Sequence, residues 1–465
     1  MNLRGKLARL EMPSAPSTRH APVKPDELAI PQAPSEASTP TREAELASPQ
    51  REHELASPLD ELRNRMRAIL ERTAITPRKL EPVDTPELPF VTHDTPKGPL
   101  HLRAYRLAAS HRMGRVSLLP ARHASPELLA LLALDPQIAS CDPMRALYID
   151  TETTGLAGGA GTVAFLIGLA FWDGEPGSIN RGLMVEQILV RALGEEAPML
   201  EHVAQRIREA SMLVSYNGKS FDLPLIRTRF VMARVQAPVE PPHFDLLHVA
   251  RRLHRARLKA RGDASTCKLT TLERLILGFE RHDDVPSADV SAHYLHFLRT
   301  GETKALLGVV EHNAWDVLAM AALLGLYGEP LESSELGVSE IAAVARTMKR
   351  AGAVDRALET AELAMERALA LPRPDLEEPL RARAEIAKAR GDRARALADY
   401  THLAESVDDP RARLELAKLY EHFVKDIPRA LELALSGTGE KEAEQSKRAG
   451  RLTRKIAQNR AKSRG

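Results

Sequence analysis

The 465-residue chain has few cysteines, few aromatic residues and almost no net charge. Its two cysteines, Cys141 and Cys267, support neither a disulfide framework nor a metal site with paired thiolates, and this fits a reducing cytoplasm. Aromatic residues make up only 4% of the chain, whereas alanine and arginine are abundant, so the composition favours helix. The net charge of +2 indicates no particular class of partner.

Long hydrophobic runs are missing as well. The first residues, MNLRGKLARLEMPS, contain no apolar core of signal-peptide length. No stretch approaches the roughly 20 apolar residues that cross a bilayer. These absences predict a cytoplasmic protein with no membrane partner. A length of 465 residues allows two or three domains, and 43% hydrophobic residues are ordinary for a soluble globular protein.

Changes in composition divide the chain into four parts. Residues 1–85 are predicted to be a mostly disordered arm with one short helix after Ser57-Pro58, because a segment rich in proline, serine, alanine and glutamate buries too little apolar surface to fold. This arm contains the degenerate repeat REAELASP and REHELASP. An α/β domain is expected over 90–330, helical repeats over 335–440 and a basic tail over 441–465.

The α/β domain is indicated by apolar segments separated by amphipathic ones. The predicted helices cover 198–210 and 221–235, and further helices follow through Tyr327. Three strands in succession, then helix, strand and helix, predict a mixed sheet with helices packed on it. The predicted strands cover 146–150, 163–172, 182–190, 212–216 and 242–247.

The C-terminal part repeats an Arg-Ala-Leu motif whose alanines are Ala357, Ala396 and Ala430. The spacings of 39 and 34 residues resemble a degenerate tetratricopeptide array, whose unit is about 34 residues. A helical bundle with coincidental similarity stays open as an alternative, because alanine-rich helices imitate such repeats easily.

Two acidic residues follow the first predicted strand in LYIDTETTGL. Asp150 and Glu152 are two positions apart, so their side chains point to one side of the strand. Two carboxylates on one side repel each other, and a hard divalent cation relieves this repulsion. The alternative is an acidic pair in a surface loop.

Two more segments bring acids into similar apolar surroundings. SYNGKSFDLPLIRTRF places Asn217 and Asp222 at a strand-to-helix turn, where Asp222 is either a helix cap or part of a site. VVEHNAWDVLAMAALL is a helix with His312 and Asp316 on one face, four residues apart. Taken singly, each residue has a structural interpretation as a satisfied core side chain.

Together, four acids from a strand end, a turn and a helix form the ligand set that holds two metal ions roughly 3.5–4 Å apart. Such a pair of ions, Mg²⁺ or Mn²⁺, supports hydrolysis of a phosphodiester, and His312 is placed to orient or deprotonate the attacking water. We therefore favour a metal-site role for Asp222.

These segments resemble known exonuclease motifs. DTETTGL is similar to the first motif of the DEDD superfamily, which has a ribonuclease-H-like fold, and SYNGKSFDLPLIRTR is similar to the second motif of proofreading domains in B-family polymerases. HNAWDV takes the third position but departs from both main subfamilies, because His312 stands four residues before the last aspartate, where one subfamily has tyrosine. Over about 146–327 the chain looks like the YprB-type ribonuclease-H-like predicted exonucleases, in which a helical-repeat segment can follow.

The resemblance implies a two-metal 3′-to-5′ exonuclease acting on nucleic acid, with single-stranded ends as substrate. It implies that the metal ligands are Asp150, Glu152, Asp222 and Asp316. It also implies that the turn from Thr153 to Gly155 and Asn217 contact the terminal nucleotide. A structure-specific endonuclease, and a scaffold that binds a protein partner through the helical repeats, stay open as alternatives.

Two further features have two interpretations each. Asp245 in HFDLLH belongs to the site or caps the helix that follows. A basic run tracks a nucleic-acid backbone or forms an exposed helix face. The run consists of Arg251, Arg252, Arg255, Arg257, Lys259 and Arg261.

Overall fold

The structure is a computed structural model that describes residues 87–155, 161–174, 182–260, 262 and 267–462. The N-terminal arm over 1–85, with its repeat and its expected short helix, lies outside these described residues and stays a prediction.

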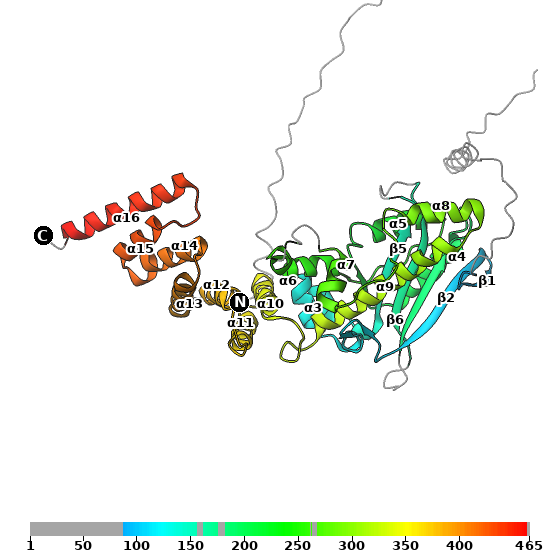
Figure 1. The fold of residues 1–465 in the computed structure, drawn as a ribbon, viewed down its shortest axis with the longest axis horizontal. Helices are drawn as coiled ribbons and strands as arrows, with labels where there is room; N and C mark the ends of the chain where they lie inside the picture. Colours follow the sequence, from blue (N-terminus) through cyan, green and yellow to red (C-terminus); the bar gives the residue numbers. More distant parts are fainter. Residues whose placement is uncertain (1–86, 156–160, 175–181, 261, 263–266, 463–465) are drawn as a thin grey trace, which may run out of the picture. The chain divides into compact units, whose positions relative to one another are not determined.

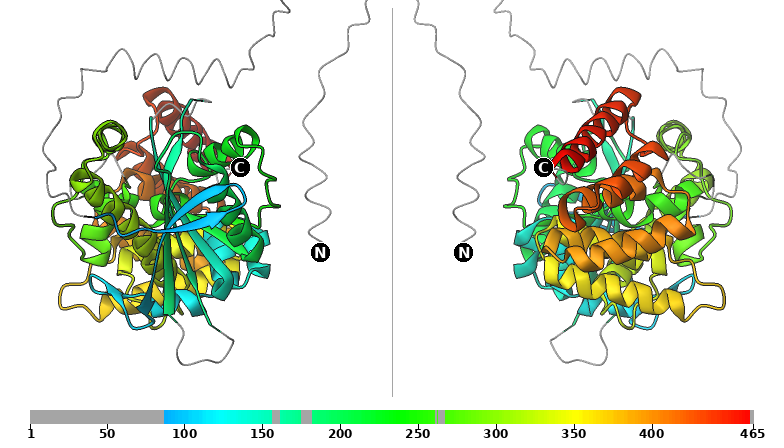
Figure 2. Two further views of the ribbon diagram at one scale, coloured as in Figure 1. Left: turned by 90° about the vertical axis from the view of Figure 1, so that its right-hand side faces the viewer. Right: turned by 90° about the vertical axis from the view of Figure 1, so that its left-hand side faces the viewer.

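Within the described residues, seven strands form one mixed sheet in the order β1-β2-β7-β6-β5-β8-β9. Figure 1 labels β1, β2, β5 and β6 of this sheet. Neighbouring strands from β1 to β5 pair antiparallel, and β8 and β9 continue parallel to β5. In the left view of Figure 2 the blue β1–β2 hairpin lies in front of the other strands. The strands are β1 (Val91–Thr95), β2 (Gly98–Ala108), β5 (Ala146–Thr153), β6 (Ala164–Trp172), β7 (Gly182–Leu189), β8 (Met212–Ser215) and β9 (His243–Asp245), and a separate small hairpin joins β3 (Arg112–Met113) to β4 (Val116–Ser117).

The predicted mixed sheet flanked by helices is confirmed, and each of the five predicted strands is present with slightly different ends. Two strands, β1 and β2, were not predicted. β1 is an edge strand of the sheet and β2 is its neighbour, and both leave many side chains partly or fully exposed, so they carry no continuous apolar run.

Helices cover both faces of the sheet, and β5 shows how the two faces are divided. Leu147 and Ile149 pack in the core under α4 (Ala197–Glu209) and α5 (Asp222–Met232). Tyr148 points to the other face and packs in the core that contains α9 (Lys304–Gly328). Because side chains alternate along a strand, the even-numbered positions of β5 that follow face α9.

The second face carries several more helices besides α9. α3 and α6 both contact α9 and share its hydrophobic core. The bounds of the helices in this part are α3 (Pro126–Ala133), α6 (Leu246–Ala260), α7 (Leu269–Leu272) and α8 (Val290–Thr300), with short 3-10 turns at Leu119–His123, Pro136–Ser140 and Pro143–Arg145 and a π-helical turn at Glu273–Leu277.

Length and composition alone would allow α9 to cross a membrane, whereas no stretch of the chain was expected to be apolar enough. However, 72% of its most apolar window is buried inside the protein, against β5, β6 and β7. The burial identifies α9 as the central core helix on this face of the sheet.

The C-terminal part is helical, as predicted. Its bounds are α10 (Val338–Arg350), α11 (Val354–Leu369), α12 (Glu377–Arg390), α13 (Arg393–Ser406), α14 (Pro410–Leu419), a π-helical turn at Tyr420–Val424, α15 (Ile427–Leu435) and α16 (Glu442–Lys462) (Figure 1, yellow to red). Ala357, Ala396 and Ala430 are fully buried near the starts of α11, α13 and α15. The repeat motif therefore marks one equivalent packing position in three helices, and the tetratricopeptide type stays a prediction.

The hydrophobic core continues from α9 into α10 and α11. His254 Nδ1 lies 3.4 Å from Glu340 Oε1, and Arg257 Nη1 donates to the same oxygen at 2.7 Å. The connection near residue 335 is thus crossed by buried contacts. The segment expected as a basic tail contains α16, where Leu452 packs against α15.

Candidate functional site

The two acids of β5 lie where the strand reaches the end of its pairing with β6. Asp150 pairs with Gly168, and the register shifts between Glu152 and Thr153. Both carboxylates continue the even-numbered side of the strand, so they face α9. One oxygen of Asp150 accepts a hydrogen bond from Asn313 Nδ2 of α9 at 2.8 Å, and this contact ties the strand end to the helix.

Asp222 is the first residue of α5 and is buried, with 8% of its surface exposed. Its Oδ1 accepts a hydrogen bond from the hydroxyl of Thr151 at 2.5 Å. Thr151 stands between Asp150 and Glu152 on β5. The turn from β8 to α5 therefore places the Asp222 carboxylate beside the two acids of the strand.

His312 and Asp316 come from the face of α9 that approaches the strand end. His312 Nε2 lies 3.9 Å from Glu152 Oε1 and 3.6 Å from Asp316 Oδ2. One ligand atom from each of these three residues lies within 4.8 Å of the other two. Residues 160 positions apart in the chain thus present oxygen and nitrogen donors at one point.

A cleft of about 560 Å³ opens beside these residues. It is lined by Asp150, Glu152 and Asp222, and by the residues predicted to contact a nucleotide, namely Thr153, Gly155 and Asn217. Phe221 also lines the cleft and is 60% exposed. The structure therefore brings all eight predicted site residues together, six along the cleft and the other two, His312 and Asp316, beside Glu152.

The carboxylates repel one another strongly. Burial raises the pKa of Asp150 well above its usual value, and the charges of Asp316, Asp222 and Glu152 raise it further. Burial also raises the pKa of Glu152 to about 7, although His312 opposes this shift. The pKa of Asp222 rises to about 6 through burial, against the hydrogen bond from Thr151. The site is therefore short of positive charge.

The donor set fits a hard divalent cation. Carboxylate oxygens are the ligands that Mg²⁺ and Mn²⁺ prefer, and an imidazole nitrogen is compatible with Mn²⁺. The raised carboxyl pKa values agree with this, because a bound cation would stabilise the ionised carboxylates that burial and mutual repulsion disfavour.

These pKa values predict that the metal-free protein loses stability as pH rises. Unfolded carboxyl groups titrate near about pH 4, whereas Glu152 titrates at about 7 in the folded protein. Between these values the folded state holds a proton that the unfolded state has released, so the stability present below about pH 4 is lost as pH approaches about 7. In EDTA, we expect the Tm of wild type to fall on the order of 5 °C further than that of Glu152→Gln between about pH 5 and about pH 8.

Added Mg²⁺ should reverse this trend in wild type, because only ionised carboxyl groups bind the ion. Thermal melts with EDTA or Mg²⁺ at each pH check the prediction. Parallel pH profiles of wild type and Glu152→Gln in EDTA would contradict it.

Asp245 caps and braces local backbone. Its carboxylate accepts hydrogen bonds from the backbone N–H of Leu247 at 3.1 Å, of Asn217 at 2.8 Å and of Lys219 at 3.1 Å. Asn217 has a φ of 69°, a left-handed conformation that these bonds stabilise. The cap interpretation of Asp245 therefore holds, and the residue also shapes the turn that leads to Asp222.

The basic run divides between internal contacts and solvent. Arg252 donates to the carbonyl of Leu132 at 2.8 Å, and Arg257 pairs with Glu340 of α10. Arg251 and Arg255 are exposed on α6. Arg261 and the side chain of Lys259 lie outside the described part of the chain. Two of the six residues are thus committed to packing, and the role of the run in binding stays a prediction.

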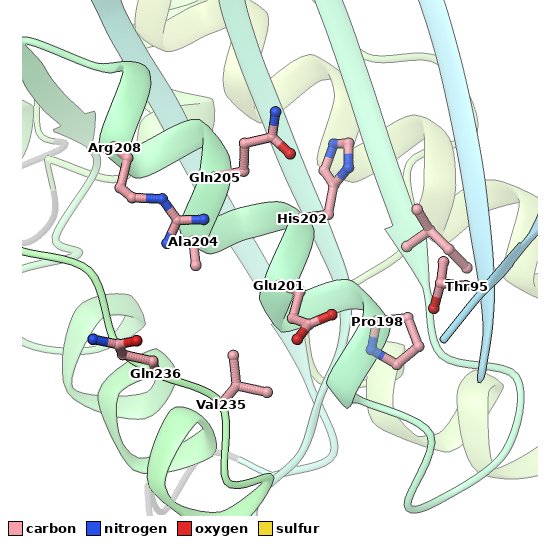
Figure 3. A pocket seen from close by; sticks show the side chains of 10 residues that line it. Thr95, Pro198, Glu201, His202, Ala204, Gln205, Arg208, Val235 and Gln236 are labelled. Atoms are coloured by element: carbon pink, nitrogen blue, oxygen red, sulfur yellow. The ribbon is translucent and has the colours of Figure 1, made fainter. Parts of the chain in front are cut away.

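A second cleft, of about 440 Å³, lies between α4 and residues 235–236 (Figure 3). Two of its lining residues contact groups on other elements, since Glu201 pairs with Lys97 at 2.8 Å and His202 Nε2 lies 2.7 Å from Glu186 Oε2. Arg208 lines this cleft and is exposed. The cleft holds no convergent set of acids, so Arg208 provides a control position.

Three residues that contact the predicted site side chains on the side away from the cleft were not predicted from the sequence. Asn313 contacts Asp150, Arg281 contacts Asp316 and His312, and Asp284 contacts His312. The only signal for Asn313 was its position next to His312 in the helix. Arg281 and Asp284 lie in a segment without helix or strand, where no periodicity indicates which way a side chain points.

Carboxylates at the end of a central strand, beside a parallel neighbour and facing a long helix, place the molecule in the ribonuclease-H-like class of α/β proteins. The family model described as the RNase_H superfamily matches residues 147–327. The chain belongs to the family of the uncharacterized protein YprB from Bacillus subtilis (strain 168). It is 31% identical to YprB over 298 residues, which cover 62% of this chain and 67% of YprB. The match of residues 147–327 to the RNase_H superfamily supports a nuclease-type hydrolase with nucleic acid as substrate.

Proposed function

We propose that the protein is a divalent-metal-dependent nuclease that removes nucleotides from the 3′ end of single-stranded DNA or RNA. One observation carries this proposal: β5, the β8–α5 turn and α9 each contribute a carboxylate, and these carboxylates lie together beside an open cleft. The 3′-to-5′ direction is supported by the likeness of the three motifs to those of DEDD exonucleases.

Asp150, Glu152, Asp222 and Asp316 would hold two Mg²⁺ or Mn²⁺ ions, which supply a nucleophilic water and stabilise the departing oxygen in phosphodiester hydrolysis. His312 directs Nε2 toward Glu152 and Asp316 and can take a proton from the attacking water. Its pKa is lowered by burial, but Asp316, Glu152 and Asp284 outweigh this effect and raise it overall.

The cleft has the chemistry to accept a terminal nucleotide. The turn from Thr153 to Gly155 is braced by a hydrogen bond from the Thr153 hydroxyl to the Gly155 carbonyl at 3.0 Å. Asn217 lies along the cleft with these residues. The exposed ring of Phe221 offers a face on which a base can stack, an interaction that tolerates any base.

The proposal is tested by digestion of a 5′-labelled single strand, as DNA and as RNA, with Mg²⁺, Mn²⁺ or chelator. We expect a metal-dependent ladder that shortens from the 3′ end with wild type and is lost with Asp222→Asn. Arg208→Ala, in the second cleft, should digest like wild type. Activity that survives in Asp222→Asn would contradict the assigned site.

A 3′-blocked strand and a circular single strand separate exonuclease from endonuclease action. We expect both to resist digestion, because an exonuclease needs a free end. Cleavage of the circle would replace the exonuclease proposal with a structure-specific endonuclease on the same fold. If linear, duplex and structured substrates all stay intact, the nuclease proposal fails.

A second role is favoured by the C-terminal helices. The equivalent buried positions of Ala357, Ala396 and Ala430 support a stacked array of helix pairs, of tetratricopeptide type, and such arrays bind peptides or partner domains. We propose that this part recruits a protein partner to the nuclease domain. Affinity capture with the full chain, with and without substitutions of exposed residues on these helices, tests this role.

A further inference from the structure

The segment between the π-helical turn and α8 supplies two charged side chains to the rear of the site. The side chain of Arg281 is 5% exposed and that of Asp284 is 27% exposed. Both lie in a stretch that is neither helix nor strand, so local structure alone does not hold them. Their contacts with α9 and with Glu273 give them fixed positions.

Arg281 joins two acids from different elements. Its Nε and Nη2 donate to the two oxygens of Glu273 at 2.7 and 2.6 Å, and Nη2 also donates to Asp316 Oδ1. A bidentate pair fixes the plane of a guanidinium, and Glu273 itself is only 1% exposed. One oxygen of Asp316 is thus held in a defined direction by a group that cannot rotate freely.

Asp284 holds the ring of His312 in a defined direction in the same way. Asp284 Oδ1 lies 2.7 Å from His312 Nδ1. Arg281 Nη1 is also 3.1 Å from Nδ1, but a nitrogen that donates to Asp284 cannot accept from Arg281. The shorter contact and the fit of a carboxylate acceptor favour Nδ1–H donating to Asp284. This leaves Nε2 directed at Glu152 and Asp316.

We propose that Arg281 and Asp284 are positioning residues for the metal-dependent hydrolysis. Arg281 orients Asp316 and Asp284 orients the ring of His312, so that both meet Glu152 at one point. This inference rests on the proposed function. Hydrogen bonds from outer groups to metal ligands typically change metal affinity or activity by about 10- to 100-fold when they are lost.

The competing interpretation is that the network only attaches this segment to α9. An attachment role predicts a change in stability without a change in metal affinity. A positioning role predicts weaker metal binding or slower hydrolysis in a protein that still folds. Metal affinity measured without substrate and the single-turnover rate, each compared with Tm, therefore separate the two roles.

The experiment compares wild type with Asp284→Asn, Asp284→Glu, Arg281→Lys and the control Arg208→Ala. Mn²⁺ binding is titrated by electron paramagnetic resonance, Tm is recorded in EDTA, and single-turnover digestion is followed at saturating Mn²⁺. We expect about 10- to 100-fold weaker Mn²⁺ binding or slower digestion in Asp284→Asn and Arg281→Lys, partial recovery in Asp284→Glu, and no change in Arg208→Ala.

Asp284→Asn keeps the experiment decisive if Arg281→Lys does not fold, because Asp284 is partly exposed and its replacement leaves the Arg281–Glu273 pair intact. Wild-type values of Mn²⁺ affinity and rate in Asp284→Asn would overturn the inference. If wild type binds Mn²⁺ but digests no substrate, the proposed function fails while the affinity differences still report positioning. A wild-type protein that binds no Mn²⁺ overturns both.

Discussion

Replacing Asp150 by asparagine is expected to abolish digestion and, at the same time, to stabilise the metal-free protein. Metal ligation contributes several kcal/mol of transition-state stabilisation, so the loss of this ligand should slow hydrolysis on the order of 1,000-fold or more. Stability should rise because burial, and then the charges of Asp316, Asp222 and Glu152, raise the pKa of Asp150 and disfavour its ionised carboxylate. Asparagine keeps an oxygen that can accept from Asn313 without the charge.

The two effects are measured by the digestion assay and by chemical unfolding in EDTA at about pH 8. We expect the free energy of unfolding of Asp150→Asn to exceed that of wild type by on the order of 2 kcal/mol. The matched control is Asp94→Asn, the same chemical change on the exposed edge strand β1, which should leave both quantities unchanged. A variant that loses both activity and stability would show that Asp150 acts through packing and not through metal binding.

Gly168→Ala should damage stability and the site together, from a position that carries no functional group. A β-carbon at Gly168 would lie 2.3 Å from Asn313 Oδ1 and 2.8 Å from Asn313 Cγ. Asn313 is fully buried, and its Oδ1 accepts from Gln187 Nε2 at 2.9 Å, so it has no room to retreat. Overpacking of this kind costs about 1–3 kcal/mol.

The same displacement would remove the hydrogen bond from Asn313 Nδ2 to Asp150. We therefore expect Gly168→Ala to bind Mn²⁺ about 10- to 100-fold more weakly, as for other outer contacts to metal ligands. Urea unfolding and Mn²⁺ titration check the two parts of this prediction.

A double variant tests the cause. Asn313→Ala removes the atoms that clash, so Gly168→Ala should cost little further stability when Asn313→Ala is already present. Metal binding should stay weak in the double variant, because the donor to Asp150 is gone. Gly450→Ala is the control, since a β-carbon there has nothing within 4 Å. If the two losses of stability add in the double variant, a clash between Ala at position 168 and Asn313 is not the cause of the loss in Gly168→Ala.

The metal-site residues could be predicted because short-range geometry controls which side of an element a residue faces. Asp150 and Glu152 share a side of β5 through the two-residue period of a strand. His312 and Asp316 share a side of α9 because they are four residues apart. In both cases the relation depends only on local backbone geometry, and it stays the same wherever the element packs.

Local geometry could not predict the groups that hold these ligands. Arg281 and Asp284 approach α9 from a segment without regular structure, and Gln187 reaches Asn313 from β7. The strands β1 and β2 were missed for a related reason, since they bury too little surface to form an apolar run. For the basic run on α6, the sequence suggests more solvent-facing charge than the fold leaves. Arg252 and Arg257 look solvent-facing in the sequence but form hydrogen bonds within the fold.

The sequence by itself therefore determined five of the seven described strands of the sheet, the side on which each acid projects and the helical character of the C-terminal part. Only the tertiary structure decided that β5, the start of α5 and α9 meet at one cleft, and which donors restrain each carboxylate. The physical reason is the separation along the chain over which each effect acts. Strand and helix periodicity acts over a few residues, whereas the contacts from Asn313 to Asp150 and from Thr151 to Asp222 join residues 163 and 71 positions apart and exist only after the layers pack.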